Sequence, residues 1–386
     1  MNGPQTHSAD LALPALSLIA VLVGLLAVYS SSLAFAIQQF DDPSYYVIRQ
    51  ALWAILGFGA MLALARLDYR RLAAWSPFLM VGTLALVALT LVPGIGLEIN
   101  GARRWLAAGP LPAVQPSELA KLSLIIYTAA WLATRGDRLS QFLRGVVPFV
   151  IIAGLTAGLI LRQPDFGTAI LILLVSTTMF FLAGARWRHL LLLLPTSALA
   201  GLLLMLREGY RYSRLQSFLD PWQDPQGIGF HIIQSLIALG SGGLTGVGIG
   251  ASRQKFFYVP SSHTDAIFAI IGEEVGLLGN LIVMAVLASL IYRCFRVAQL
   301  TKDPFGQLLA CGVASLFAIQ ALVNIGGISR SIPFTGVPLP FVSYGGSSLA
   351  ANLAAIGILM SISRFRETPE VGVRRRTARL AEARPA

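Results

Sequence analysis

The chain has 386 residues, of which 55% are hydrophobic and 12% are charged, and its formal net charge is +11. Its mean hydropathy of +0.71, with apolar runs of about 20 residues, is typical of a helical integral membrane protein and excludes a soluble domain. The runs lack the alternation over roughly ten residues that marks the strands of a membrane β-barrel. The positive charges lie mainly in short loops and in the C-terminal tail, so they favour membrane orientation over nucleic-acid binding.

Apolar segments taken in chain order predict an all-α fold with about ten transmembrane helices. The expected spans are 11–37, 46–64, 74–93, 117–134, 145–161, 167–184, 188–206, 266–292, 305–329 and 344–363. We expect residues 1–366 to form one transmembrane domain. Residues 367–386 are expected to form a basic, disordered cytoplasmic tail that is suited to contact anionic lipid.

Arginine and lysine are distributed unevenly between alternate loops. One side carries Arg66, Arg70, Arg71, Arg135, Arg138, Arg144, Arg186, Arg188, Arg293, Arg296 and Lys302, together with the tail. The short loops of the other side carry only Arg49, Arg103, Arg104, Arg162 and Arg330. The positive-inside rule therefore predicts a multi-pass protein with both termini in the cytoplasm.

This orientation places a large extracytoplasmic loop, about 207–265, between the seventh and eighth helices. Loops of that length are usually functional or disordered. Within it, apolar residues at 230, 233, 236 and 237 form one stripe of a helix. That helix is expected either to lie in the membrane interface or to cover the bundle as a lid.

Several ionisable residues lie close together near the end of this loop. A glycine run, Gly240–Gly250, is followed by Arg253, Lys255, His263 and Asp265. An ionisable cluster on a membrane protein indicates a functional site by default. The glycine run does not follow a strand in a βαβ unit, and no Gly-Lys-Ser/Thr follows it, so we reject a nucleotide site. The four histidines are too scattered to suggest a metal-ligand cluster.

Two charged residues lie just inside the fourth expected span. Glu118 and Lys121 are three residues apart, so they share one face of a helix. Burying either charge alone is costly, and we predict that they pair inside the bundle, either as a structural ion pair or as part of a cavity lining. Upstream, Trp105 follows Arg104 on the outer side; this pair is either an interfacial anchor or a sugar- and phosphate-facing set.

The motifs of the chain together resemble those of the SEDS family, the group of FtsW, RodA and SpoVE, from the first span to the tenth. They are Asn100-Gly101-Ala102-Arg103-Arg104-Trp105, Gln115-Pro116-Ser117-Glu118-Leu119-Ala120-Lys121, Gln163-Pro164-Asp165-Phe166-Gly167-Thr168-Ala169, Phe218-Leu219-Asp220-Pro221-Trp222, His263-Thr264-Asp265 and Pro338-Leu339-Pro340-Phe341-Val342-Ser343-Tyr344-Gly345-Gly346-Ser347-Ser348. Their form is more similar to the FtsW division branch than to the RodA elongation branch. Ser261 stands where the family usually has glutamate, and Ala266 stands where phenylalanine is common.

The resemblance implies a peptidoglycan glycosyltransferase that polymerises lipid II on the outer face of the bacterial cytoplasmic (inner) membrane, with inversion at the anomeric carbon. It makes Asp265 the catalytic carboxylate. The further residues expected to bind substrate or line the cavity are Trp105, Arg104, Glu118, Lys121, His263, Ser343 and Tyr344. Independently of the family, the loop cations are candidates for contact with the diphosphate: Arg253, Lys255, Arg207, Arg211 and Arg214.

A departing diphosphate needs cationic stabilisation, so we expect a divalent cation, Mg or Mn, and no organic cofactor. Its ligands are unknown, with Asp265 as one candidate. The resemblance also implies a class B penicillin-binding protein (a transpeptidase) as partner, together with other division or elongation membrane proteins and membrane lipid. No nucleic-acid partner is expected. A lipid II flippase, a non-catalytic scaffold and an elongation role remain as alternatives; the flippase would explain Glu118 and Lys121 but gives Asp265 no special task.

Overall fold

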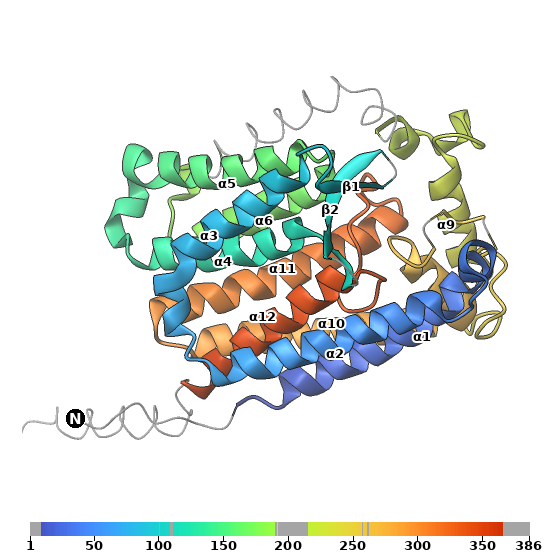
Figure 1. The fold of residues 1–386 in the computed structure, drawn as a ribbon, viewed down its shortest axis with the longest axis horizontal. Helices are drawn as coiled ribbons and strands as arrows, with labels where there is room; N and C mark the ends of the chain where they lie inside the picture. The colour runs from blue at the N-terminus through green and yellow to red at the C-terminus, as the bar shows by residue number, and fades with distance from the viewer. Residues whose placement is uncertain are drawn as a thin grey trace, which may run out of the picture.

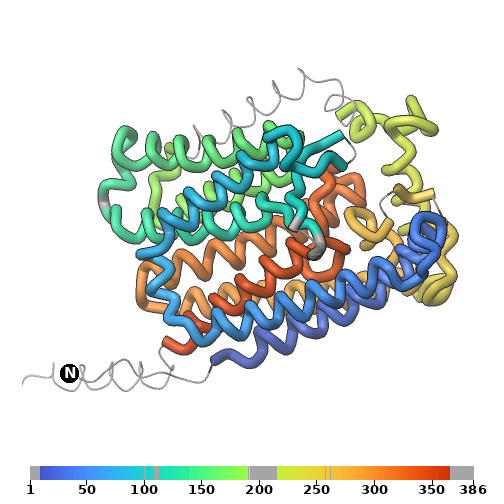
Figure 2. Tube along the Cα trace, viewed as in Figure 1, coloured from blue at the N-terminus to red at the C-terminus, as the bar shows by residue number. Residues whose placement is uncertain are grey.

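A computed structural model describes residues 9–99, 101–108, 111–189, 191, 215–256, 258–260 and 262–365. Within these residues, long helices run side by side along the long axis of the molecule, and most connecting segments gather at its two ends (Figure 1). The helices are α1 Ala12–Phe40, α2 Tyr45–Arg66, α3 Arg70–Thr90, α4 Pro116–Ala133, α5 Val147–Leu161, α6 Phe166–Leu182, α9 Phe230–Ser241, α10 Ile267–Leu300, α11 Pro304–Ile328 and α12 Gly346–Arg364. α1 begins and α12 ends at the same end of the bundle (Figure 2).

The helical membrane class is confirmed. Seven helical segments of the described chain are long and apolar enough to cross a membrane, namely α1, α2, α3, a segment Phe142–Leu161 that includes α5, α10, α11 and α12. α4 and α6 occupy the fourth and sixth expected spans, and α6 is a shorter apolar helix of 17 residues. Nearly all of the seventh expected span, 188–206, lies outside the described residues, as does the tail 367–386. The number of spans therefore stays a prediction.

A small antiparallel sheet lies between α3 and α4, which the all-α expectation omits. Its strands are β1 Gly96–Ile99, β2 Ala102–Ala108 and β3 Leu111–Val114, in the order β1-β2-β3. Leu97 pairs with Trp105 across the first two strands. The sequence Asn100-Gly101 is a strong short-range hairpin signal, and Gly101, which precedes β2, has a φ of 74°.

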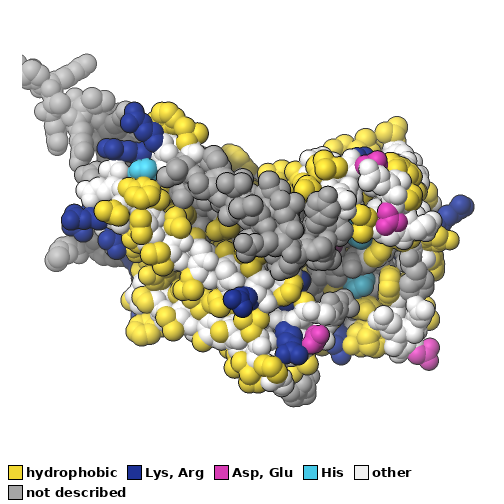
Figure 3. Space-filling view, turned by 90° about the horizontal axis from the view of Figure 1, so that it is seen from above, with side chains coloured by type: hydrophobic (Ala, Val, Ile, Leu, Met, Phe, Trp, Pro, Cys, Tyr) yellow, Lys and Arg dark blue, Asp and Glu magenta, His cyan; other side chains and the backbone are white. Residues whose placement is uncertain are grey.

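The arginine-rich loops gather at one end of the bundle. The connections α2–α3, α4–α5 and α10–α11 lie there, whereas the sheet and α9 lie at the other end (Figure 1). In Figure 3 the visible acidic side chains lie on the half of the molecule that holds the sheet and α9. The uneven distribution of positive charge along the sequence thus places positive charge at one end of the bundle. Which side of the membrane each end faces stays a prediction.

Small residues let the helices approach closely. α2 packs along α12, and a Cβ atom added at Gly357 of α12 would lie 2.4 Å from the carbonyl oxygen of Met61 in α2. Such close backbone approach is the usual way in which membrane helices associate, because dispersion contacts replace the hydrophobic effect there.

α10 is broken at Gly276, whose φ of 74° suits only glycine without strain. The glycine-rich segment Gly242–Gly250 fills the break. Four backbone hydrogen bonds join them: Val247 N to Glu273 O (2.9 Å), Gly248 N to Glu274 O (3.0 Å), Leu277 N to Gly243 O (2.9 Å) and Leu278 N to Leu244 O (3.1 Å). Irregular backbone is tolerated near a membrane only when its polar groups find such partners.

Candidate active site

Asp265 lies on a short irregular segment, residues 262–266, which leads into α10. Three other parts of the fold hold this segment. The hydrogen bonds are Ser262 Oγ to Ser31 O of α1 (3.0 Å), Tyr344 N to His263 O (2.9 Å) and Asn324 Nδ2 of α11 to Asp265 O (2.8 Å). Asn324 Nδ2 also donates to Val337 O at 2.8 Å. The backbone of Asp265 is therefore fixed by contacts from α1, α11 and the 329–345 connection.

The carboxylate of Asp265 stands at the N-terminal end of α10 and is half-buried. Ala266 occupies the N-cap position of α10, directly after Asp265. The partial positive charge at the helix N-terminus favours an anionic group nearby, as a general base requires.

His263 belongs to an aromatic cluster beside Asp265. Its ring centroid lies 4.5 Å from Tyr46, 5.6 Å from Tyr344 and 5.8 Å from Phe35. Burial lowers the pKa of His263 to about 4, so its imidazole is neutral at physiological pH. Its Nδ1 atom is buried and has no hydrogen-bond partner among the described residues.

Ser343 and Tyr344, two of the expected site residues, lie where the 329–345 connection enters α12. Ser343 Oγ accepts a hydrogen bond from Leu339 N at 2.9 Å, and Gln50 Nε2 of α2 donates to Ser343 O at 3.2 Å. Burial raises the pKa of Tyr344 to about 12, so its hydroxyl keeps its proton. The structure thus brings Tyr344 into contact with His263, on the segment that carries Asp265, while Ser343 holds the 329–345 connection to α2.

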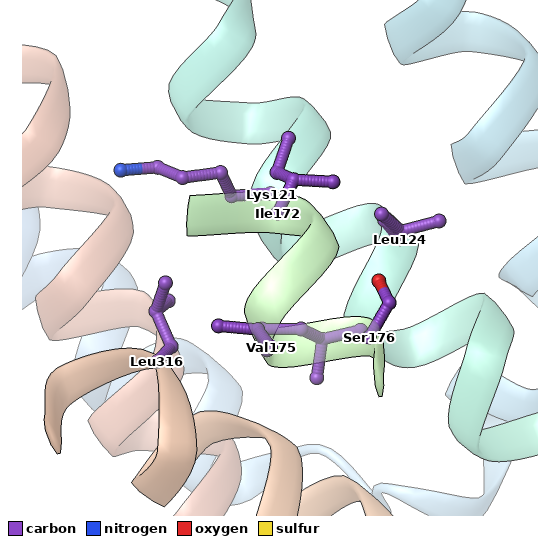
Figure 4. A pocket seen from close by; sticks show the side chains of 7 residues that line it. Lys121, Leu124, Ile172, Val175, Ser176 and Leu316 are labelled. Atoms are coloured by element: carbon purple, nitrogen blue, oxygen red, sulfur yellow. The ribbon is translucent and has the colours of Figure 1, made fainter. Parts of the chain in front are cut away.

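Glu118 and Lys121 pair inside the bundle as predicted, with Lys121 Nζ 2.8 Å from Glu118 Oε2. The N-terminal end of their helix, α4, is tied to α12 because Gln115 N donates to Ser347 Oγ at 3.0 Å. Lys121 also lines a cavity of about 10 Å³ between α4, α6 and α11, walled by Leu124, Ile172, Val175, Ser176 and Leu316 (Figure 4). That volume is about the room one water needs, so it does not accommodate a substrate.

Arg104 and Trp105 lie on β2. Arg104 Nε donates to Gln163 O at 2.9 Å, and its Nη2 donates to Pro164 O, so the guanidinium fastens the sheet to the turn between α5 and α6. Trp105 is half-buried opposite Leu97. No described contact joins this pair directly to Asp265.

The loop cations divide into three groups. Arg253 has an exposed side chain, and Arg207, Arg211 and Arg214 lie outside the described residues. Lys255 is wholly buried, and its ammonium lies 3.0 Å from Glu274 Oε1. Its charge is neutralised within the protein, so the structure gives Lys255 an internal partner in place of the expected diphosphate.

Glu273, Glu274 and Asn324 hold the site but were absent from the candidates drawn from the sequence. Two adjacent acidic residues inside an apolar span are a signal of function or of a buried network, and that signal was available. Nothing in local spacing marks Asn324, because its partners lie on two other segments.

The described residues contain no group of three or more His, Cys, Asp or Glu side chains that would hold a metal ion alone. Mg²⁺ is commonly bound by one or two carboxylates together with substrate phosphates. The single carboxylate of Asp265 would fit that donor set.

Comparison with known proteins adds a second, independent line of evidence. The family model for FtsW, RodA and SpoVE, described as "Cell cycle protein", matches residues 10–368. The chain is 42% identical over 360 residues to the stage V sporulation protein E of Bacillus subtilis (strain 168), covering 93% of this chain and 98% of that protein. It is 38% identical over 370 residues to a probable peptidoglycan glycosyltransferase FtsW of Geobacter metallireducens, covering 96% and 98%.

Solved structures agree with the sequence relatives. One similar structure is a chain of a peptidoglycan synthase complex that coordinates polymerization and crosslinking, with a TM-score of 0.77, 32% identity and coverage of 93% of this chain and 99% of that chain. Another is the rod shape determining protein RodA of Thermus thermophilus, with a TM-score of 0.68, 30% identity and coverage of 93% and 98%. The chain therefore belongs to the FtsW/RodA/SpoVE family.

Proposed function

We propose that this chain is a peptidoglycan glycosyltransferase that polymerises lipid II on the outer face of the bacterial inner membrane. The observation that carries the proposal is the position of Asp265, a half-buried carboxylate on a segment held by α1, α11 and the connection to α12. Relatives named peptidoglycan glycosyltransferase, which match nearly the whole chain, support the same reaction class.

In the proposed reaction, Asp265 acts as the general base. Its carboxylate takes the proton from the acceptor sugar hydroxyl as the hydroxyl oxygen forms a bond to the anomeric carbon of the donor. The bond between that carbon and the diphosphate oxygen breaks, and its electron pair leaves with the diphosphate. One carboxylate suffices, because a diphosphate needs charge stabilisation more than protonation as it departs.

Cations are needed where the negative charge of the diphosphate develops. Arg253, exposed on the loop that precedes Asp265, and the loop arginines Arg207, Arg211 and Arg214 are the proposed protein contacts. A divalent cation, Mg or Mn, held by Asp265 and the diphosphate, would supply further charge stabilisation there. Arg104, Trp105 and Tyr344 are proposed to bind the sugars, while the Glu118–Lys121 pair braces the cavity wall.

The motif forms and the relatives support a proposed cellular role and a proposed partner. The motif forms favour septal synthesis during cell division, with a class B penicillin-binding protein that crosslinks the glycan. The similar chain in a peptidoglycan synthase complex supports a partner of that kind. Both termini are proposed to lie in the cytoplasm, since the arginine-rich loops share an end with the start of α1 and the end of α12.

The decisive experiment reconstitutes the purified chain with lipid II and measures the length of the glycan products, with and without the transpeptidase partner. We expect polymer in the presence of the partner and divalent cation. Movement of lipid II across a vesicle membrane without any polymer would contradict this function and favour the flippase.

A further inference from the structure

Glu273 and Glu274 are adjacent buried carboxylates in the first half of α10, just before its break at Gly276. The proposed reaction gives neither residue a task. Both instead bind residues 252–255, which we call the clasp segment and which precedes Asp265 in the chain. A buried carboxylate is costly unless it is fully hydrogen-bonded or paired, so the partners of these two side chains are informative.

Glu273 organises the backbone of the clasp segment. Its carboxylate accepts hydrogen bonds from Arg253 N at 3.0 Å, from Gln254 N at 3.3 Å and from the hydroxyl of Ser252. Hydrogen bonds to a carboxylate are stronger than those between neutral groups, so these three bonds fix the backbone of residues 252–254 against α10.

Glu274 holds the side chain that ends the clasp segment. Its Oε1 accepts hydrogen bonds from Lys255 Nζ at 3.0 Å and from Ser30 Oγ of α1 at 2.6 Å. Lys255 Nζ also donates to Gly250 O at 2.6 Å. The side chains of Lys255 and Glu274 are only 1% and 6% exposed, so this ion pair is shielded from solvent and salt.

Backbone hydrogen bonds hold described residues that lie between the clasp segment and Asp265. Phe256 N donates to Arg253 O at 3.2 Å and Val259 N donates to Gln254 O at 2.9 Å, with Val259 wholly buried. Ser262 then binds Ser31, the neighbour of the Ser30 that binds Glu274. Asp265 therefore lies in the stretch between Lys255 and Glu274, whose two ends are joined by the Lys255–Glu274 ion pair.

We propose that Lys255 and Glu274 are positioning residues, whose ion pair fixes Asp265 at its working distance from the acceptor hydroxyl. The proposal rests on the proposed polymerase function and assigns a task to two residues outside the reaction centre. A displacement of about 1 Å at a catalytic group can cost on the order of a hundredfold in rate. A buried ion pair contributes little net stability compared with apolar side chains, so geometric control is the effect to test.

The fold supplies a control ion pair at the opposite end of the same helices. Arg293 Nη2 of α10 lies 2.6 Å from Asp10 Oδ2, next to the start of α1, and joins no part of the Asp265 segment. We would compare Glu274→Gln, Lys255→Met and the double variant with Arg293→Met, in the full-length protein with its partner. The measurements are the Tm, kcat and KM for lipid II polymerisation, and hydrogen exchange of the amides at 262–266.

We expect each single variant, including Arg293→Met, to lower the Tm. Only Glu274→Gln, Lys255→Met and their double variant should lower kcat by about tenfold or more, with KM changed less than about threefold. Only these variants should speed hydrogen exchange at residues 262–266. The double variant removes both charges of the pair, so neither is left without its partner, and the Tm should recover while kcat stays low.

Two results would overturn the proposal. One is a double variant that regains wild-type kcat, because the pair would then be merely structural. The other is an equal loss of kcat in Arg293→Met at equal Tm. If the wild-type protein forms no polymer at all, the proposed function itself fails, and the exchange comparison still decides whether the pair holds the Asp265 segment.

Discussion

Lys121 Nζ lies 2.8 Å from Glu118 Oε2 on successive turns of α4, and the two side chains are only 3% and 4% exposed. The pair places both charges of the helix in contact inside the bundle. Removing one partner leaves the other buried and uncompensated, which typically costs about 3–5 kcal/mol.

The first prediction is a double-mutant cycle on this pair. Glu118→Gln and Lys121→Met should each destabilise the protein, and the double variant should lose less stability than the sum, by about 0.5–3 kcal/mol. Thermal or denaturant unfolding in detergent measures the coupling. Strictly additive losses would show that the two charges are not energetically linked.

The second prediction concerns Asp265→Asn. Asparagine keeps the size and most hydrogen-bonding capacity of aspartate but cannot accept the proton of the acceptor hydroxyl. We expect normal folding, partner binding and lipid II binding, with polymerisation slowed at least about a hundredfold. Glycan of wild-type length and yield from the purified variant would remove Asp265 from the mechanism.

The third prediction is a pH dependence of stability that arises from His263. Its pKa is about 4 in the folded protein and about 6.5 in the unfolded chain, so the unfolded state binds more protons between these values. The contribution of neutral His263 is fully present above pH 6.5 and is lost as pH falls toward 4. Stability should drop by about 2 kcal/mol from pH 7 to pH 5 through this residue.

The difference between wild type and His263→Gln isolates that contribution, because all other titrating groups are shared. The stability of the variant should vary less with pH over this window. Identical profiles of stability against pH for the two proteins would mean that the pKa of His263 does not differ between the folded and unfolded states.

The fourth prediction tests the divalent cation. Excess chelator should abolish polymerisation, and added Mg or Mn should restore it. Full activity in excess chelator would leave arginine side chains as the source of diphosphate stabilisation. A thermal-shift measurement with Mg and an unreactive diphosphate lipid gives a readout that does not depend on turnover.

The fifth prediction tests the orientation. Cysteine placed at the exposed Ser241 should react from outside intact spheroplasts with a membrane-impermeant thiol reagent, and cysteine at the exposed Gln141 should not. The native Cys294 and Cys311 lie within α10 and α11, so the parent chain gives the background. Reaction at Gln141→Cys in sealed cells would reverse the proposed topology.

Local features of the sequence were sufficient for the helical membrane class, for most helix positions and for the Glu118–Lys121 pair. The bilayer imposes the length of an apolar helix, and a spacing of three residues places two side chains on one helix face whatever the rest of the chain does. The same reasoning identified the arginine-rich loops, which the fold gathers at one end. The sheet between α3 and α4 was missed, although Asn100-Gly101 carries its hairpin signal.

The tertiary structure alone decided which charges meet across the chain. Lys255 is bound to Glu274 and to Ser30, which stands 225 residues earlier, and Asp265 is held by Asn324 from another helix. The break at Gly276 is likewise stable only because the glycine-rich segment supplies its hydrogen bonds. These contacts depend on how α1, α10, α11 and α12 pack against one another, and that packing is a property of the whole bundle that no local spacing encodes.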